Sequence, residues 1–171
     1  MEKALVAIIM GSDSDLKVMQ ESAKVMEEFD IPYYIDVISA HRTPHQALEF
    51  SKNAHINGIK VIIAAAGMAA HLAGSLAAHT PLPVIGVPIA GGKLQGKDSL
   101  YSTVMMPPGV PVATVGIDGA RNAGLLAVQI LGTGDAAMME KMMVFKRDQE
   151  KKVVARSEKL KSLGYKAYVE G

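Results

Sequence analysis

The sequence contains no cysteine and no tryptophan among its 171 residues. The lack of cysteine excludes disulfides, thiolate catalysis and most zinc sites, and it leaves the cellular compartment open. Neither sign of charge dominates, because 18 Lys and Arg balance 17 Asp and Glu to a formal net charge of +1. A balanced charge gives no general attraction to nucleic acid or to anionic membranes, so we expect neither as a partner.

Long apolar runs are also missing. No stretch of about 18 apolar residues occurs, so no transmembrane helix is expected. The N-terminus has no signal-peptide layout, and a cytoplasmic location is the default expectation. Aromatic residues make up only 5% of the chain although hydrophobic residues make up 49%. The core is therefore expected to consist of aliphatic residues and Met, and the apolar excess favours an obligate oligomer over an apolar monomer.

Segments typical of strands and helices alternate along the chain. Strands are expected at residues 5–10, 33–38, 61–65, 84–88 and 112–117. Helical spacing is expected over residues 16–29, 44–57, 67–79, 98–104, 122–131 and 136 to about 163. This alternation predicts an α/β fold in which helices cover both faces of a parallel sheet. We expect residues 1–171 to form one domain, a three-layer α/β/α sandwich.

The turn after the second expected strand carries the most informative motif, Ser-Ala-His-Arg-Thr-Pro at residues 39–44. Thr43 and Pro44 are typical of the N-cap and first position of a helix. His41 and Arg42 thus lie where a strand ends and a helix begins, an edge at which α/β proteins bind ligands. A histidine there can exchange a proton near neutral pH, and Arg42 beside Ser39 suits a phosphate. The alternatives are a surface histidine and a surface salt bridge.

A second polar turn, Gly-Ser-Asp-Ser-Asp at residues 11–15, follows the first expected strand. Its backbone N–H groups and two hydroxyls can hold an anion, and Asp13 or Asp15 can accept from ribose hydroxyls. The alternative, equally favoured by the pattern, is that Asp13 only caps the following helix and that the two serines only satisfy backbone hydrogen bonds of the turn. The glycines and lysine of dinucleotide and P-loop motifs are missing, so neither a nicotinamide cofactor nor ATP is indicated. Two such turns can share one crevice, which would bring together Ser12, Asp15, Ser39, His41 and Arg42.

The third turn, residues 65–74, is built from small residues with one histidine, His71. Small residues allow close approach to a ligand, so this turn can line an apolar pocket with His71 at its rim. The alternative is tight packing of a helix on the sheet, with His71 as a buried and satisfied histidine. His55 and His79 have no such context and are expected on the surface.

A metal site is not expected. His41, His45 and Glu49 are spaced by four residues, but Pro44 places His41 outside the helix and the register is lost. Zinc usually takes three or four ligands, and no Cys or third nearby His supplies them.

Together these segments resemble the PurE family, the N5-carboxyaminoimidazole ribonucleotide mutases (class I) of bacterial purine synthesis. The matching segments are residues 10–15, 39–44, 69–72, 82–88, 98–100 and 108–114. The resemblance implies a flavodoxin-like core and a homo-octamer with active sites between subunits. It also implies interconversion of N5-carboxyaminoimidazole ribonucleotide and 4-carboxy-5-aminoimidazole ribonucleotide without ATP, metal or organic cofactor. The implied partners are this nucleotide and CO2, and the sequence leaves open a transient contact with the enzyme that supplies the N-carboxylated substrate.

The resemblance also implies roles for individual residues. His41 would be the general acid/base, and Ser12, Asp15 and Arg42 would bind substrate, with Ser14 and Ser39 near its phosphate. The imidazole and carboxylate would lie against the third turn, at Gly67, Ala69, Ala70, His71 and Leu72. These roles suit the chemistry. CO2 leaves the nitrogen of the substrate and is held beside the imidazole ring. A ring carbon then attacks the CO2, and a proton must be removed from that carbon, a step that suits a histidine of near-neutral pKa.

Two residues depart from the family's usual third turn, Gly-Gly-Ala-Ala-His-Leu-Pro-Gly. Met68 stands in place of a Gly, which would narrow the pocket or alter loop mobility, and Ala73 stands in place of the Pro. The sister class, which carboxylates aminoimidazole ribonucleotide directly, resembles Ala-His-Lys at residues 40–42 and Gly-Arg-Ser-Asn at 67–70, and both sites favour the mutase. A flavodoxin-like module that only binds a phosphorylated ligand is the other alternative, and it leaves His41 unexplained.

Overall fold

The computed structural model describes residues 3–170, which are organised around one five-stranded sheet. The strands are β1 (Val6–Met10), β2 (Tyr33–Val37), β3 (Val61–Gly67), β4 (Val84–Ile89) and β5 (Ala113–Thr114). Their order is β2-β1-β3-β4-β5, and every adjacent pair is parallel. This order is that of flavodoxin-like folds, so the expected fold class is confirmed.

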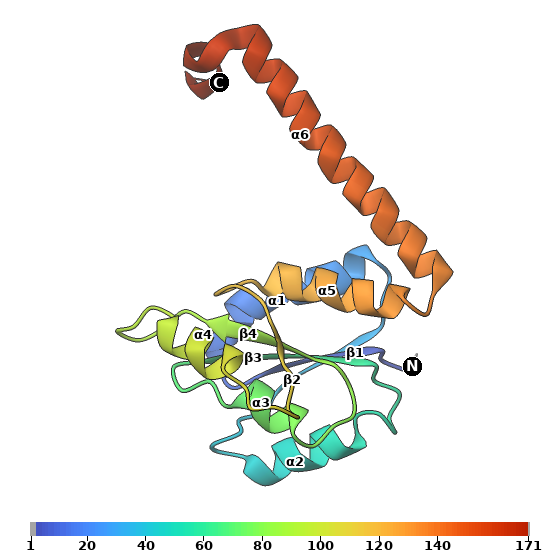
Figure 1. The fold of residues 1–171 in the computed structure, drawn as a ribbon, viewed down its shortest axis with the longest axis vertical. Helices are drawn as coiled ribbons and strands as arrows, with labels where there is room; N and C mark the ends of the chain where they lie inside the picture. Colours follow the sequence, from blue (N-terminus) through green and yellow to red (C-terminus); the bar gives the residue numbers. More distant parts are fainter. Residues whose placement is uncertain (1–2, 171) are drawn as a thin grey trace.

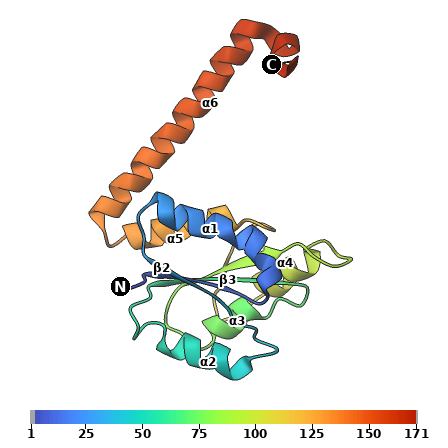
Figure 2. The ribbon, with the colours of Figure 1, turned by 180° about the vertical axis from the view of Figure 1, so that it is seen from behind.

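Helices cover both faces of the sheet (Figures 1 and 2). The helices α1 (Leu16–Glu28) and α5 (Ala120–Gly132) lie on one face, and α2 (Pro44–Asn53) and α3 (Leu72–Ala77) lie on the other. A short 3-10 helix, η1 (Asp13–Asp15), precedes α1, while α4 (Lys97–Val104) follows β4. The result is the expected three-layer arrangement.

Two apolar cores lie on either side of the sheet because side chains alternate along each strand. On β1, Val6, Ile8 and Met10 face the core shared with α1 and α5, whereas Ala7 and Ile9 face the core under α2 and α3. All five residues are at most 1% exposed. Burial on both faces explains why β1, β3 and β4 are continuous apolar runs rather than alternating ones.

Three elements are shorter than their sequence patterns predict. The strand expected at 112–117 pairs in register with β4 only at Ala113 and Thr114. Beyond them the chain stays beside β4 through single bonds, from the Val115 N–H to Gly86 at 3.0 Å and from the Asp118 N–H to Pro88 at 2.9 Å. The helix expected at 44–57 ends at Asn53, and residues 54–58 form turns that close at Gly58 with φ +96°. The third helix begins at Leu72 rather than residue 67, since Met68 has a left-handed φ of +54°.

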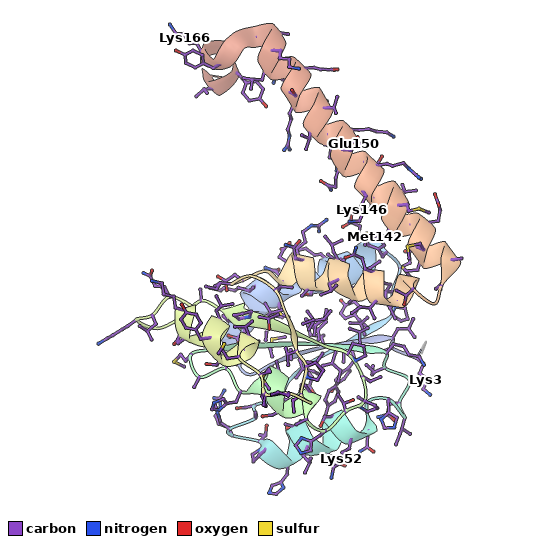
Figure 3. The ribbon with its side chains drawn as sticks, viewed as in Figure 1. Lys3, Lys52, Met142, Lys146, Glu150 and Lys166 are labelled. Carbon is purple, nitrogen blue, oxygen red and sulfur yellow. The ribbon has the colours of Figure 1, made fainter. Side chains whose placement is uncertain are left out.

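The last helix, α6 (Ala136–Glu170), packs on the sandwich only at its start and then projects away from it (Figure 1). Met142 lies where α6 meets the sandwich, whereas Glu150 and Lys166 lie on the projecting part (Figure 3). Gly164, with φ +72° and ψ 161°, interrupts the helix near the expected end at residue 163. Within residues 3–170, no helix combines the length and apolar character needed to cross a membrane.

Candidate active site

The turns that follow β1, β2 and β3 meet at the carboxyl edge of the sheet. These strands are neighbours in the sheet, so their carboxyl ends lie side by side. A cavity of about 560 Å³ opens between the turns, and the loop after β4 forms its remaining wall. The cavity is lined by Gly11, Ser12, Ser14, Asp15, Ser39, Ala40, His41, Arg42, Ala66, Gly67, Met68, Ala69, His71, Leu72, Ile89, Ala90, Gly91 and Gly92.

Two histidines face each other in this cavity. The Nε2 atom of His41 lies 2.6 Å from Nδ1 of His71, and the rings meet edge to face with centroids 4.7 Å apart. A contact of this length fits a hydrogen bond in which one ring nitrogen donates and the other accepts, and the tautomers of the two rings decide which does which. Both side chains are exposed, and the alternative of His71 as a buried core histidine is therefore wrong.

Arg42 is held against the neighbouring turn by hydrogen bonds. Its Nη2 donates to the carbonyl of Gly11 at 2.8 Å, and its Nε donates to Oγ of Ser39 at 3.4 Å. The surface salt bridge offered as its alternative is not found, because none of the ion pairs within residues 3–170 includes Arg42. The guanidinium thus faces the cavity with spare N–H donors, as an anion site requires.

Local side-chain bonds hold the turn at residues 39–43. Thr43 is the residue before α2 and Pro44 is its first residue, as expected. The Thr43 hydroxyl does not cap α2, however. It accepts from the backbone N–H of Ser39 at 3.0 Å and donates to the Ser39 carbonyl at 3.0 Å. These bonds close the turn and fix the backbone that carries His41 and Arg42.

The first turn is a network of hydroxyl groups beside one buried carboxyl. Ser12, rather than Asp13, caps η1, since its Oγ accepts from the Ser14 N–H at 3.4 Å. The Ser14 hydroxyl lies 2.9 Å from Oγ of Ser12 and 3.2 Å from Oδ1 of Asp15. Asp15 is only 8% exposed, and its burial raises the pKa of its carboxyl although bonds from Ser14 and Ser12 oppose the shift.

The third turn forms the apolar wall of the cavity. Gly67, Ala69, His71 and Leu72 line it, as expected, but Ala70 does not, because it is only 2% exposed and lies beneath the turn. Met68 also lines the cavity, which the resemblance pointed to only as a departure. Within residues 3–170, no group of three or more His, Asp or Glu side chains is placed to hold a metal ion.

Sequence reasoning missed the wall formed by Ala90, Gly91 and Gly92. The signal was available, because these residues follow β4 just as the other turns follow their strands. The carboxylate of Asp118 fixes this loop by accepting from the Ala90 N–H at 2.8 Å.

A family model described as AIR carboxylase matches residues 5–152. The chain belongs to the AIR carboxylase family. Two of its relatives are named N5-carboxyaminoimidazole ribonucleotide mutase. The protein from Pyrococcus horikoshii is 54% identical over 98% of this chain and 95% of its own length. The protein from Pyrococcus abyssi is 57% identical over 97% of this chain and 95% of its own length. The family also includes the Saccharomyces cerevisiae protein named phosphoribosylaminoimidazole carboxylase, which is 53% identical over 99% of this chain but only 30% of its own length.

A solved structure of the same fold agrees with this membership. The crystal structure of Treponema denticola PurE superimposes with a TM-score of 0.84 at 28% identity, covering 92% of this chain and 99% of that one. The AIR carboxylase family fold therefore accounts for nearly all of the chain.

Proposed function

We propose that this AIR carboxylase family protein is an N5-carboxyaminoimidazole ribonucleotide mutase of purine biosynthesis. It interconverts N5-carboxyaminoimidazole ribonucleotide and 4-carboxy-5-aminoimidazole ribonucleotide. The observation that carries the proposal is one cavity that joins an anion site at Arg42 to an apolar wall, with His41 between them. Relatives that match over nearly their full length carry the name of this enzyme.

The polar end of the cavity suits the nucleotide's ribose phosphate. Arg42 and the hydroxyls of Ser12, Ser14 and Ser39 supply donors for phosphate oxygens. Asp15, next to these hydroxyls, supplies acceptors for ribose hydroxyls. The base then extends toward the small-residue wall of the third turn.

His41 is the proposed general acid/base. Decarboxylation breaks the bond between nitrogen and the carboxyl carbon, and the nitrogen gains a proton as CO2 leaves. The ring carbon then attacks CO2, and the proton on that carbon must be removed to restore the aromatic ring. One proton enters and one leaves, so a single histidine completes the cycle. His71 is within hydrogen-bond distance of His41 and can orient its ring for both steps.

The apolar wall has a separate proposed task. CO2 has no charge, so it is held by exclusion from water and by proximity rather than by ion pairing. Gly67, Ala69 and Leu72 border the space next to the two histidines and leave room for the ring and CO2. No step needs ATP, a metal ion or an organic cofactor.

Direct carboxylation of aminoimidazole ribonucleotide is the second candidate function. It is favoured by the name of the Saccharomyces cerevisiae relative, although this chain spans under a third of that protein. The motifs Ala40-His41-Arg42 and Gly67-Met68-Ala69-Ala70 differ from those of direct carboxylases and favour the mutase. The two reactions differ in the carboxyl source, which is the nucleotide itself in one and dissolved CO2 in the other.

The proposed assembly is a homo-octamer with active sites between subunits, and two unpartnered apolar surfaces support self-association. Near the end of α4, Tyr101 and Val104 of the helix and Met105 just after it are 64%, 49% and 77% exposed. On the projecting part of α6, Val153 and Leu160 are 64% and 42% exposed. Soluble monomers seldom leave such clustered apolar area uncovered.

Two further expectations belong to the same proposal. One is a cytoplasmic location. The other is transient contact with the enzyme that makes the N-carboxylated substrate, since a labile N-carboxylate favours a short transfer path.

The first test incubates the purified protein with 4-carboxy-5-aminoimidazole ribonucleotide in the absence of ATP and metal and follows its ultraviolet absorbance. We expect the wild-type protein to cause a loss of absorbance. The rate of this loss should be lower by about 10²-fold or more in His41→Asn, while nucleotide binding persists. Freshly made N-carboxylated substrate then distinguishes the mutase from the direct carboxylase. Absence of turnover in folded, assembled wild-type protein would contradict the proposal and leave a ligand-binding module.

A further inference from the structure

Met68 has two unfavourable features that packing does not explain. Its φ of +54° lies in the left-handed region, where a side chain is strained and glycine is favoured. Its apolar side chain is also 62% exposed rather than buried in either core. Strained residues that persist in a fold cluster at functional sites, and Met68 lines the cavity that holds His41 and His71.

The Met68 side chain extends across the cavity rim to the loop after β4. A Cβ atom built on Gly92 would lie 3.8 Å from Cγ of Met68 and 4.0 Å from its Sδ. Met68 leaves the end of β3, whereas Gly92 follows the end of β4. The thioether side chain therefore bridges the two walls of the cavity.

We propose that Met68 is a retention residue, whose side chain closes the apolar side of the site against Gly92 and keeps released CO2 beside the nucleotide. This inference rests on the proposed mutase function. Gly67, Ala69 and Gly92 line the cavity near Met68 and have little or no side chain with which to cover this side of it. A long, unbranched and flexible side chain suits this task, because it can move aside for the nucleotide and return.

The strained backbone of Met68 contributes to the proposed closure of the cavity. A left-handed residue directs its side chain away from the path that a helical or extended residue would give it. Here that direction carries the side chain out of β3 and over the rim toward Gly92. Asp118, which holds the Ala90 N–H, fixes the opposite wall, so Met68 closes on a defined surface.

Isotope incorporation measures retention directly. Unlabelled N5-carboxyaminoimidazole ribonucleotide is converted in ¹³C-bicarbonate, and the labelled fraction of the early product is read by mass spectrometry. A parallel reaction from aminoimidazole ribonucleotide corrects for direct carboxylation. Three variants distinguish the effect of the side chain from that of the backbone. Met68→Leu keeps a large apolar side chain, and Met68→Ala removes most of the side chain but keeps the strained backbone. Met68→Gly removes both the side chain and the strain.

We expect a mostly unlabelled product from the wild type and Met68→Leu, and at least a threefold higher labelled fraction from both Met68→Ala and Met68→Gly. Equal labelling in Met68→Ala and wild type would overturn the proposal. Increased labelling in Met68→Gly alone would also overturn it, since backbone freedom rather than the side chain would then control escape. A fully labelled wild-type product would show that no CO2 is retained. If wild type makes no product at all, the proposed mutase function itself fails and the role of Met68 fails with it, whereas the labelling outcomes above overturn the role of Met68 alone.

Discussion

At the scale of single residues, the buried carboxyl of Asp15 lines the cavity and opposes folding at neutral pH. Burial raises its pKa in the folded protein above the ordinary value of 3.8. The folded state therefore holds this proton more tightly than the unfolded state. The free energy of unfolding therefore falls as pH rises from 3.8 through the raised pKa of Asp15, because the folded state must then give up a proton that it binds more tightly. At neutral pH the ionised carboxyl of Asp15 destabilises the folded protein by the full amount.

Replacing Asp15 by Asn should remove that cost. The amide oxygen can still accept from the Ser14 hydroxyl, so the turn is kept. We expect Asp15→Asn to raise the Tm at pH 7 by a few degrees and to flatten the pH dependence just above pH 3.8. Nucleotide affinity should fall. Thermal unfolding across pH, with the exposed Asp148→Asn on α6 as a control, checks this, and a lower Tm at pH 7 in Asp15→Asn would contradict it.

The positions of His41 and Arg42 were predictable because a strand pattern, a Thr-Pro helix start and their spacing all constrain one short turn. The contact between His41 and His71 was not, since it joins residues 30 apart and depends on how two turns meet. Ala70 was predicted to line the site, yet it is only 2% exposed and does not line the cavity, because its side chain lies beneath the turn. Roles assigned to these residues stay predictions.

At the scale of helices and strands, α1 and α5 approach closely at a glycine. A Cβ atom on Gly124 would lie 2.8 Å from Cβ of Val25 and 3.2 Å from both of its methyl groups. We expect Gly124→Ala to destabilise the protein by about 1–3 kcal/mol, because overpacking exceeds the gain of up to about 1 kcal/mol in helix propensity. Gly134→Ala is the matched control, since a Cβ there meets nothing within 4 Å. Urea unfolding at equal protein concentration measures both, and equal midpoints would refute close packing here.

The edge strand β2 should give the protein a defined alkaline transition. The Tyr34 hydroxyl donates to the Asp36 carboxylate, and this bond raises the pKa of Tyr34 from 10 to about 12. The unfolded chain therefore loses this proton first, so the stabilisation is complete below pH 10 and is lost as pH rises through 12.

Tyr34→Phe should reduce the loss of stability between pH 10 and 12 while it keeps the stacking on Phe50. Because Tyr34 is 41% exposed, we expect a change of less than about 1 kcal/mol at pH 7. Denaturant midpoints at pH 8 and 11 measure this, with Tyr165→Phe as an exposed control. An unchanged alkaline slope in Tyr34→Phe would show that the bond to Asp36 is not maintained in solution.

Element types were predictable throughout, because buried parallel strands and amphipathic helices have distinct apolar patterns. Element ends were less so. The 112–117 segment has strand composition, but only Ala113 and Thr114 pair in register, and single bonds from Val115 and Asp118 hold the rest beside β4. Such ends are set by contacts with distant segments, which a local pattern does not contain.

At the scale of the whole molecule, α6 continues an apolar face beyond anything it covers. Met142 and Phe145 pack against the core of α1 and α5. Further along the helix, Val153, Leu160 and Leu163 lie on the same face, because their distances in sequence from Met142 are close to whole numbers of helical turns. These three side chains are 64%, 42% and 47% exposed. In addition, α6 has an excess of Lys and Arg, whereas the rest of the chain has an excess of Asp and Glu. Both properties suit α6 to pack on another copy. That residues 1–171 form one domain stays a prediction.

Charges introduced on this face should therefore disrupt the assembly without unfolding the sandwich. We expect wild-type protein to sediment as eight chains of 18.1 kDa, and the double variant Val153→Asp, Leu160→Asp to sediment as smaller species. Glu150→Ala, on the same projecting part of α6, is the control and should leave the assembly intact (Figure 3). The far-ultraviolet circular dichroism should be unchanged, since neither substituted side chain contacts either core. If the sites lie between subunits, turnover falls together with the octamer fraction. An octamer that survives both aspartates would show that the α4 surface, rather than α6, holds the copies together.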